Sequence, residues 1–154
     1  MADYKENAIY RIGMLAVLNN KERIRMAKTY AEKDVGKWTV NDLIAYMDNH
    51  HRDRFGIDYQ PFGGWDAERG RIGQWFGTAR KAGKYDKELV KEFVDHCFAT
   101  YKPTQKYPGL NFGFMATYMT REFQSVQKAY NQRKKDEEEE ATEPIEDLSD
   151  WFNS

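Results

Sequence analysis

The chain has 154 residues, of which 40% are hydrophobic, and this length and composition favour a single folded domain. Its longest apolar stretch near the N-terminus, residues 12–18, falls well short of the ~18 residues of a membrane span, so we expect no membrane partner. The single cysteine, Cys97, excludes an internal disulfide and a cysteine zinc site, and we therefore expect a cytoplasmic protein.

The net charge of −1 hides a strong asymmetry along the chain. All 24 Lys and Arg residues lie at or before Lys135, whereas nine of the 25 Asp and Glu residues lie after it. Residues 1–135 thus carry +8, from 24 basic and 16 acidic residues, and residues 136–154 carry −9. This asymmetry divides the chain into a basic body, residues 1–135, and an acidic tail, residues 136–154.

The first part of the body is predicted to be helical. Apolar residues recur at helical spacing over residues 8–18 and again over residues 21–33, and each segment predicts a helix. A further helix begins after Thr39, which can cap it because Asp42 stands three residues on, and it ends at Gly56.

The middle of the body contains a loop and then a helix that glycine weakens. Residues 56–64 include a proline and a glycine pair, which predict a loop, and we expect its aromatic side chains to fold back onto the body. Residues 66–82 predict a helix with Trp75 and Phe76 inward, although its three glycines each cost about 1 kcal/mol relative to alanine.

The last part of the body gives the clearest helical patterns. Residues 86–101 carry a broad apolar stripe that Pro103 ends, and residues 110–133 predict one long final helix. The acidic run of residues 136–140 cannot bury apolar surface and is expected to be solvated and mobile. Because no segment shows the sustained two-residue alternation of a strand, the predicted fold is all-α. We expect a compact bundle of five or six helices with a disordered acidic C-terminal tail.

The end of the tail carries apolar residues among acids, at positions i, i+3, i+6 and i+7. On a helical turn such side chains gather on one side, and aromatic anchors dominate the binding energy of many interfaces. The pattern predicts a docking site for a protein hub, formed by Ile145, Leu148, Trp151 and Phe152. The alternative is that the tail folds back and completes the core of the body.

The spacing of these residues resembles that of peptides that bind replication sliding clamps. Those peptides place a polar residue, usually Gln, three positions before an aliphatic residue, and two aromatic residues follow; here Ile145 stands in place of Gln. The position and acidity of the tail are similar to those in phage replication and late-transcription proteins. They also resemble the tails of single-stranded-DNA-binding proteins, in which the apolar residue commonly comes last. The resemblance implies a sliding clamp, polymerase or helicase as the hub.

Basic residues of the body cluster around Trp75 and Phe76 and near the end of the last predicted helix. Since basic groups neutralise phosphates and aromatic rings can stack on bases, the clusters predict a surface that binds nucleic acid, with DNA as the expected partner. The basic residues are Arg69, Arg71, Arg80, Lys81, Lys84, Lys128, Arg133, Lys134 and Lys135. The alternative is that the two aromatic residues are core and that the charges are a solvated face or favour a helix C-terminus.

A wider resemblance covers residues 38–119. The order of Trp38, FGIDYQPF, YDKELVKEFVDHCF and YPGLNFGFM resembles small helical modules of phage-encoded replication accessory proteins, including DnaD-type and helicase-loader modules. The resemblance lies in the placement of aromatic and turn residues. It implies binding to DNA or to a replication complex without catalysis.

Candidate catalytic and metal-binding residues are few. His50 and His51 are adjacent, so on a helix they point about 100° apart and make a poor metal pair; a solvated helix end is the favoured interpretation. Cys97 lies within an apolar stripe, which is typical of an inert core thiol. We therefore expect no catalytic residue, no metal ion, no cofactor and no enzymatic activity.

The sequence thus favours a non-enzymatic adaptor of a phage-type replication or transcription machine. Its body would bind DNA or a DNA-bound protein, and its tail would dock a hub. Two alternatives stay open: a protein–protein regulator of a host factor without DNA contact, and a single-stranded-DNA-binding accessory protein. The −9 tail could also cover the +8 body and inhibit it.

Overall fold

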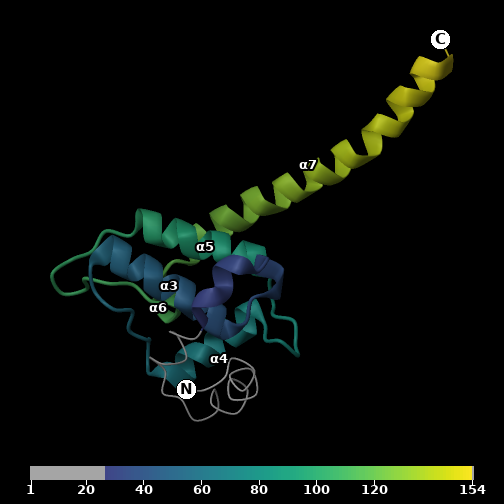
Figure 1. Ribbon diagram of the computed structural model, residues 1–154. Coiled ribbons are helices and arrows are strands. Elements are labelled where there is room, and N and C mark those ends of the chain that lie inside the picture. The colour runs from purple at the N-terminus through teal and green to yellow at the C-terminus, as the bar shows by residue number, and fades with distance from the viewer. Residues whose placement is uncertain (1–26, 154) are drawn as a thin grey trace.

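The computed structural model describes the backbone of residues 27–153 and the side-chain surroundings of residues 30–142. Within these residues the protein is a helical bundle from which one long helix protrudes (Figure 1). The predicted all-α fold is confirmed there. The elements are the 3-10 helices η1 (Ala27–Glu32) and η2 (Val35–Lys37) and the α-helices α3 (Val40–Phe55), α4 (Trp65–Phe76), α5 (Lys87–Thr100), α6 (Phe112–Tyr118) and α7 (Thr120–Asn153).

The predicted helix over residues 8–18 lies outside the described residues. The helix predicted over residues 21–33 is described from residue 27 onward, and there it is the 3-10 helix η1. The Trp38 indole N–H, which lies just after η2, donates to the carbonyls of Tyr30 (3.1 Å) and Lys33 (3.2 Å). This buried side chain therefore holds the η1 segment against α3.

Helix α3 begins and ends where the sequence predicts. The Thr39 hydroxyl accepts a hydrogen bond from the Asp42 N–H (3.2 Å), and the Asp42 carboxylate accepts one from the Thr39 N–H (2.9 Å), which completes a capping box. At the other end Gly56 has a φ of 72°, a left-handed conformation that favours glycine.

The polar end of α3 is only partly solvated, and the prediction of a solvated helix end is wrong for His51 and Asp48, which are both buried. The Nδ1 atom of His51 lies 2.8 Å from the Ile57 carbonyl oxygen, and Nε2 accepts from the Leu110 N–H (3.1 Å). A backbone N–H can only donate, so the proton of the neutral ring is on Nδ1. His50, by contrast, is exposed.

Helix α5 lies within the bundle and contacts α3, α4, α6 and α7 (Figure 1). Its predicted apolar stripe is confirmed as core, and full burial of a large apolar side chain contributes roughly 1.5–3 kcal/mol. The buried residues of the stripe are Leu89, Val90, Phe93, Val94, Cys97 and Phe98.

Helix α4 is shorter than predicted, because it ends at Phe76 and not at residue 82. Gly77 has a φ of 90°, which side-chain-bearing residues rarely adopt, and a Cβ atom there would lie 2.5 Å from the backbone nitrogen of Gly83. The chain therefore turns at Gly77 and comes back against the end of α4.

The single helix predicted over residues 110–133 is in fact two helices, α6 and α7. Met119 leaves the helical conformation, with φ −111° and ψ 36°. The start of α6 is held by side chains: Asn111 accepts from the Phe114 N–H (2.9 Å), and the Tyr59 hydroxyl accepts from the Phe112 N–H (2.7 Å). The position of α6 is thus fixed by the loop before α4 as well as by its own cap.

A buried carboxylate connects that loop, residues 56–64, to α6. Glu68 accepts hydrogen bonds from the Phe62 N–H (2.8 Å), the Tyr59 hydroxyl (3.2 Å) and the Gly113 N–H (2.7 Å). Burial raises the pKa of Glu68, and these donors oppose that rise. Because Tyr59 is only 3% exposed, the prediction that the loop folds back onto the body is confirmed.

Helix α7 runs beside α5 and then leaves the body (Figure 1). We call its last part, residues 131–153, the arm. Residues 131–142 are all exposed, so the acidic run of residues 136–140 is solvated as expected. It is helical, however, where disorder was expected. Glutamate propagates a helix well, and the body has already nucleated this one. The boundary drawn at residue 135 from charge alone falls inside α7.

Candidate functional site

The segment between α4 and α5 forms a tight loop, residues 77–84, which we call the Thr78 loop. The Thr78 N–H donates to the Lys81 carbonyl (2.8 Å). The Thr78 hydroxyl oxygen accepts from the N–H groups of Arg80 (3.3 Å) and Lys81 (3.1 Å). One threonine thus fixes the backbone on both sides of the tip, and the basic residues stand on a defined scaffold.

The Thr78 loop is also fixed against the end of α4. The N–H groups of Lys84 and Tyr85 donate to the carbonyls of Gln74 (2.8 Å) and Trp75 (3.1 Å). Gly83 approaches so closely that a Cβ atom there would lie 2.5 Å from the Trp75 carbonyl oxygen. Backbone contacts therefore set the position of the loop before any ligand is present.

Two adjoining hollows flank the Thr78 loop, with volumes of about 530 Å³ and about 400 Å³. They share Arg69, Gly70 and Thr78, and the larger one is also lined by Lys81 and Lys84. Among the described residues, none that lines either hollow is acidic. The local potential is therefore positive, and the three glycines of the larger hollow leave its backbone open to close approach.

The structure places the predicted basic residues of this region in different settings. Arg80, Lys81 and Lys84 are exposed on the Thr78 loop. Arg71 instead serves the body, because its guanidinium donates to the Phe62 carbonyl (2.8 Å) and lies 5.0 Å from the centre of that ring. Arg71 is thus held by contacts within the body, whereas the other three basic residues stand on the Thr78 loop.

Arg69 is half-buried and lines both hollows. Its guanidinium bonds to the side chain of Asn41 and lies 5.6 Å from the centre of the Trp65 ring. These contacts hold the side chain in place from the body side. Arg69 therefore contributes positive charge to the hollows from a fixed position on α4, whereas the basic residues of the Thr78 loop are exposed side chains.

The aromatic residues between these cations belong to the core, as the alternative interpretation held. Phe76 is fully buried. The Trp75 ring packs against four other aromatic rings with centroid distances of 4.9–5.8 Å. Phe76 is thus closed to a base, and the partly buried Trp75 ring is held within this aromatic cluster. The four partners of Trp75 are Tyr85, Phe93, Phe112 and Phe123.

The predicted cations of α7 lie apart from the Thr78 loop in sequence, and half of them are paired. Arg133 pairs with Glu92 of α5, and the Lys134 ammonium lies 3.7 Å from Glu88. Since α7 continues beyond them, these residues do not stand at a helix C-terminus. The other two are exposed: Lys128 and Lys135.

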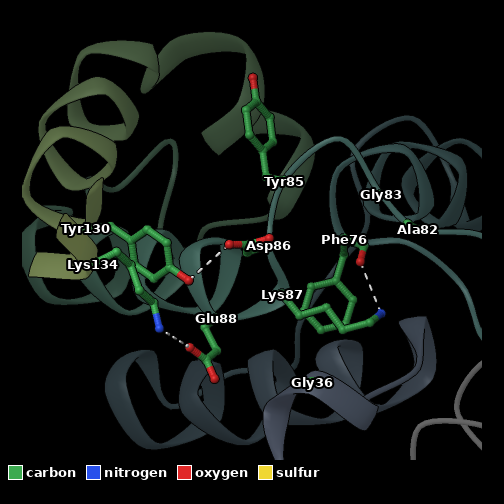
Figure 2. Close-up of a pocket in the computed structure, with 10 residues that line it drawn as sticks. All are labelled: Gly36, Phe76, Ala82, Gly83, Tyr85, Asp86, Lys87, Glu88, Tyr130 and Lys134. Carbon is green, nitrogen blue, oxygen red and sulfur yellow. Dashed lines mark hydrogen bonds and ion pairs between the residues drawn. The ribbon is translucent and has the colours of Figure 1, made fainter. Parts of the chain in front are cut away.

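A third hollow, of about 590 Å³, lies where α7 meets the start of α5 (Figure 2). Its lining carries both signs of charge, and these groups bond within the protein. The Tyr130 hydroxyl donates to Asp86 (3.2 Å), Lys134 lies 3.7 Å from Glu88, and the Lys87 ammonium donates to a backbone carbonyl (3.1 Å). Burial lowers the pKa of Lys87. This hollow thus marks the joint that anchors the arm.

The residues considered for catalysis lie elsewhere. Cys97 is fully buried, and burial raises the pKa of its thiol to about 12, so the prediction of a core thiol is confirmed. Within the described residues no three His, Cys, Asp or Glu side chains converge to hold a metal ion.

Sequence reasoning missed Thr78 and the glycines that shape the hollows. A signal was present, because Gly77 and Gly83 bracket a short polar segment with two basic residues, which is typical of a loop and not of a helix. The predicted docking side chains of the tail, at positions 145, 148, 151 and 152, lie outside the residues whose side chains the structure describes; their backbone is part of α7.

Comparisons with protein-family models, with curated proteins and with solved structures find no match to this chain. No helix in the described part of the chain is both long and apolar enough to cross a membrane. The described residues therefore define an all-α domain with a cationic loop surface and a protruding helix.

Proposed function

We propose that the protein is a non-enzymatic adaptor whose body binds the phosphate backbone of nucleic acid through the Thr78 loop and whose arm docks a protein. The proposal that the body binds nucleic acid rests on one observation. The two hollows beside the loop are lined by Arg69, Lys81 and Lys84, and none of the described residues that line them is acidic. Lysine and arginine that neutralise phosphates supply most of the non-specific affinity for nucleic acid.

The rigidity of the Thr78 loop supports this proposal. Three hydrogen bonds to Thr78 fix the tip, so the cations lose little backbone freedom when they bind an anion. The hollow at the α5–α7 joint offers no such site, because Asp86 and Glu88 line it. We therefore expect phosphate to bind in the hollow beside the Thr78 loop, whose charges are all positive. The hollow at the α5–α7 joint, whose basic and acidic groups offset each other, is the weaker candidate.

The second half of the proposal rests on the arm. Residues 131–142 are exposed helix, and nine acidic residues follow Lys135 with four large apolar residues among the last ten positions. A helix of this kind suits a partner that presents an apolar groove with a basic rim, such as a sliding clamp or another replication hub. Because α7 carries its acids away from the body (Figure 1), self-inhibition by the tail would require α7 to bend.

The nucleic-acid half is tested with two matched double variants of the full chain. Lys81→Gln with Lys84→Gln removes two charges at the hollow, and Lys128→Gln with Lys135→Gln removes two charges on α7. Fluorescence anisotropy with a labelled duplex, at several salt concentrations, gives affinity and salt slope. We expect the loop variant to lower the slope of log K against log salt by about 1.8, since each phosphate contact contributes about 0.9.

Equal losses in the two variants would show that binding depends on net charge and not on the Thr78 loop. If the wild-type protein does not bind a duplex or a single strand even at low salt, the nucleic-acid half is wrong. The alternative of a protein–protein regulator without DNA contact would then be favoured.

The arm is tested by direct binding to a purified sliding clamp in a calorimeter. We expect the full chain to bind and the Trp151→Ala, Phe152→Ala variant to lose binding, because aromatic anchors commonly contribute 2 kcal/mol or more. A Ser149→Ala variant is the control, since it changes the same segment without removing an apolar residue. Equal binding by all three proteins would exclude the predicted docking residues.

A further inference from the structure

A second exposed surface lies at the other end of α5, where residues 101–118 follow its last turn. The two most exposed aromatic side chains of the described residues are here, with Tyr107 57% and Tyr118 65% exposed. Tyr101 and Phe114 are half-buried beside them. We call these four residues the aromatic edge. None of them belongs to the Thr78 loop, so their exposure needs a separate explanation.

The rings of the aromatic edge form a connected row. The Tyr101 and Phe114 ring centres are 6.0 Å apart, and those of Phe114 and Tyr118 are 5.0 Å apart. The Tyr101 hydroxyl donates to the Tyr107 carbonyl (2.8 Å), which brings the backbone of the fourth residue to the end of the row. The rings meet at interplanar angles of 71° and 46°, so the row is stepped, and its most exposed rings are those of Tyr107 and Tyr118.

The backbone that carries the edge is fixed. The Tyr107 N–H donates to the Thr104 hydroxyl (3.0 Å), and the Thr104 N–H donates to the Tyr107 carbonyl (3.1 Å). The Arg54 guanidinium donates to the carbonyls of Phe98 (2.8 Å) and Tyr101 (3.2 Å), which ties the end of α5 to α3. A platform held in this way needs little ordering before a ligand binds.

The segment that carries the edge has charge of one sign. Residues 96–121 contain no Asp or Glu, and their three cations, Lys102, Lys106 and Arg121, are exposed. The Lys106 ammonium lies 5.4 Å from the centre of the Tyr107 ring. Asp58, in the loop after α3, pairs with Arg52 of that helix (3.1 Å). Acidic residues border the segment at Asp95 and Glu122, and Asp53 is exposed beside Arg54. The edge therefore combines exposed rings with a local excess of positive charge.

From this combination we infer that the aromatic edge is a stacking platform for single-stranded nucleic acid. Unpaired bases have free faces that stack on aromatic side chains whatever their sequence, and neighbouring cations neutralise the phosphates between them. A duplex keeps its bases stacked on each other, so it can use the cations but not the rings. A neutral apolar peptide would use the rings but would gain nothing from the cations.

The test uses the full chain, a labelled oligothymidylate and a duplex of equal length. We expect Tyr118→Ala and Tyr107→Ala each to weaken oligothymidylate binding by roughly 5- to 150-fold, as is usual for the loss of one stacked base, and to leave duplex binding unchanged. Both side chains are more than half exposed, so these variants should fold, which circular dichroism verifies.

Two further variants separate stacking from simple apolar contact. Tyr118→Phe keeps the ring and should keep the affinity, whereas Tyr118→Leu keeps apolar area without a π face and should lose it. Retained affinity in the leucine variant would overturn the inference. So would equal weakening of the single strand and the duplex, or no binding of oligothymidylate by the wild type. The proposal for the Thr78 loop fails separately, because its lysine variants weaken duplex binding.

Discussion

The body and the arm share one continuous helix, yet different interactions stabilise them. Among the side chains of α7 that the structure describes, up to residue 142, the last buried one is Tyr130, whose hydroxyl bonds to Asp86 at the start of α5. From there to residue 142 every side chain is exposed, and contacts such as the Gln132–Asp136 hydrogen bond (2.9 Å) link neighbouring turns of the same helix. The comparison teaches that helix-forming residues can extend a helix outward, whereas burial is needed for it to contribute to the stability of the fold.

Substituting residues whose surroundings are described tests this difference between the body and the arm. A change in the body removes contacts between segments far apart in the chain, so it should alter the free energy of global unfolding. A change in residues 135–142 of the arm, beyond the Arg133 and Lys134 pairs with α5, affects only its own turns, so it should alter local helicity.

Gly83→Ala should have the largest effect. The new Cβ atom would lie 2.5 Å from the Phe76 carbonyl carbon and the Trp75 carbonyl oxygen, and backbone atoms cannot move aside as a side chain would. We expect a loss of about 3 kcal/mol or more in the free energy of unfolding, measured by urea denaturation with circular dichroism.

Gly70→Ala is the matched control, because nothing lies within 4 Å of the new Cβ atom and Gly70 is inside α4. We expect it to stabilise the protein by about 0.5–1 kcal/mol, since alanine favours the helix more than glycine does. Similar losses in the two variants would mean that the Thr78 loop is not held against α4 as described.

Glu68→Gln should have an intermediate effect. The carboxylate accepts hydrogen bonds from Tyr59, Phe62 and Gly113, whereas an amide has one acceptor oxygen and turns an NH2 group toward a donor. We expect a loss of about 1–3 kcal/mol at neutral pH. Glu88→Gln, at an exposed pair with a 3.7 Å separation, should cost less than 0.5 kcal/mol under the same conditions.

The same variant should also change the pH dependence of stability. Burial raises the pKa of Glu68 in the folded state, so the folded protein keeps this proton to a higher pH than the unfolded chain does. The stability that this group contributes is complete below the ordinary pKa of 4.5 and is lost as the pH rises through the folded-state pKa. The difference in unfolding free energy between wild type and Glu68→Gln should therefore decrease above pH 4.5. An increase would show that the hydrogen-bond donors outweigh burial.

Glu138→Gly in the arm should have the smallest effect on global unfolding. The side chain is exposed and far along α7 from Tyr130, so we expect a change within 0.5 kcal/mol. Glycine should nevertheless lower the helical signal of the folded protein, because it weakens the exposed turns by about 1 kcal/mol. A large loss of global stability would show that the arm packs against the body.

The sequence predicted the elements whose signals are local. The capping box of Thr39 and Asp42 and the apolar stripe of α5 each lie within one helix, so periodicity and capping rules were sufficient. It did not predict the break between α6 and α7, because the apolar spacing continues through Met119. The start of α6 depends on Tyr59 and Glu68, which are 53 and 45 residues away from their partners.

The sequence predicted only part of the candidate site, because residue types are visible in a sequence but their distant partners are not. Residue types placed Arg80, Lys81 and Lys84 at a basic surface, and they are exposed there. Composition cannot tell an exposed arginine from Arg71, which caps the Phe62 carbonyl. The buried His51 shows the converse error, since its partners, Ile57 and Leu110, belong to loops that a helical pattern does not describe.

The helical backbone of the arm couples its length to its direction. At 1.5 Å and about 100° per residue, residues 131–143 project over roughly 20 Å and fix the side of the axis on which each of these positions falls. Pro144 follows, and a proline inside a helix removes a hydrogen bond and favours a kink. Two added residues would turn the tip by about 200°, to the opposite side, while seven would restore nearly the same side about 10 Å farther out. The helix up to Pro144 thus keeps a set bearing relative to the body, which a flexible linker of equal length would not impose.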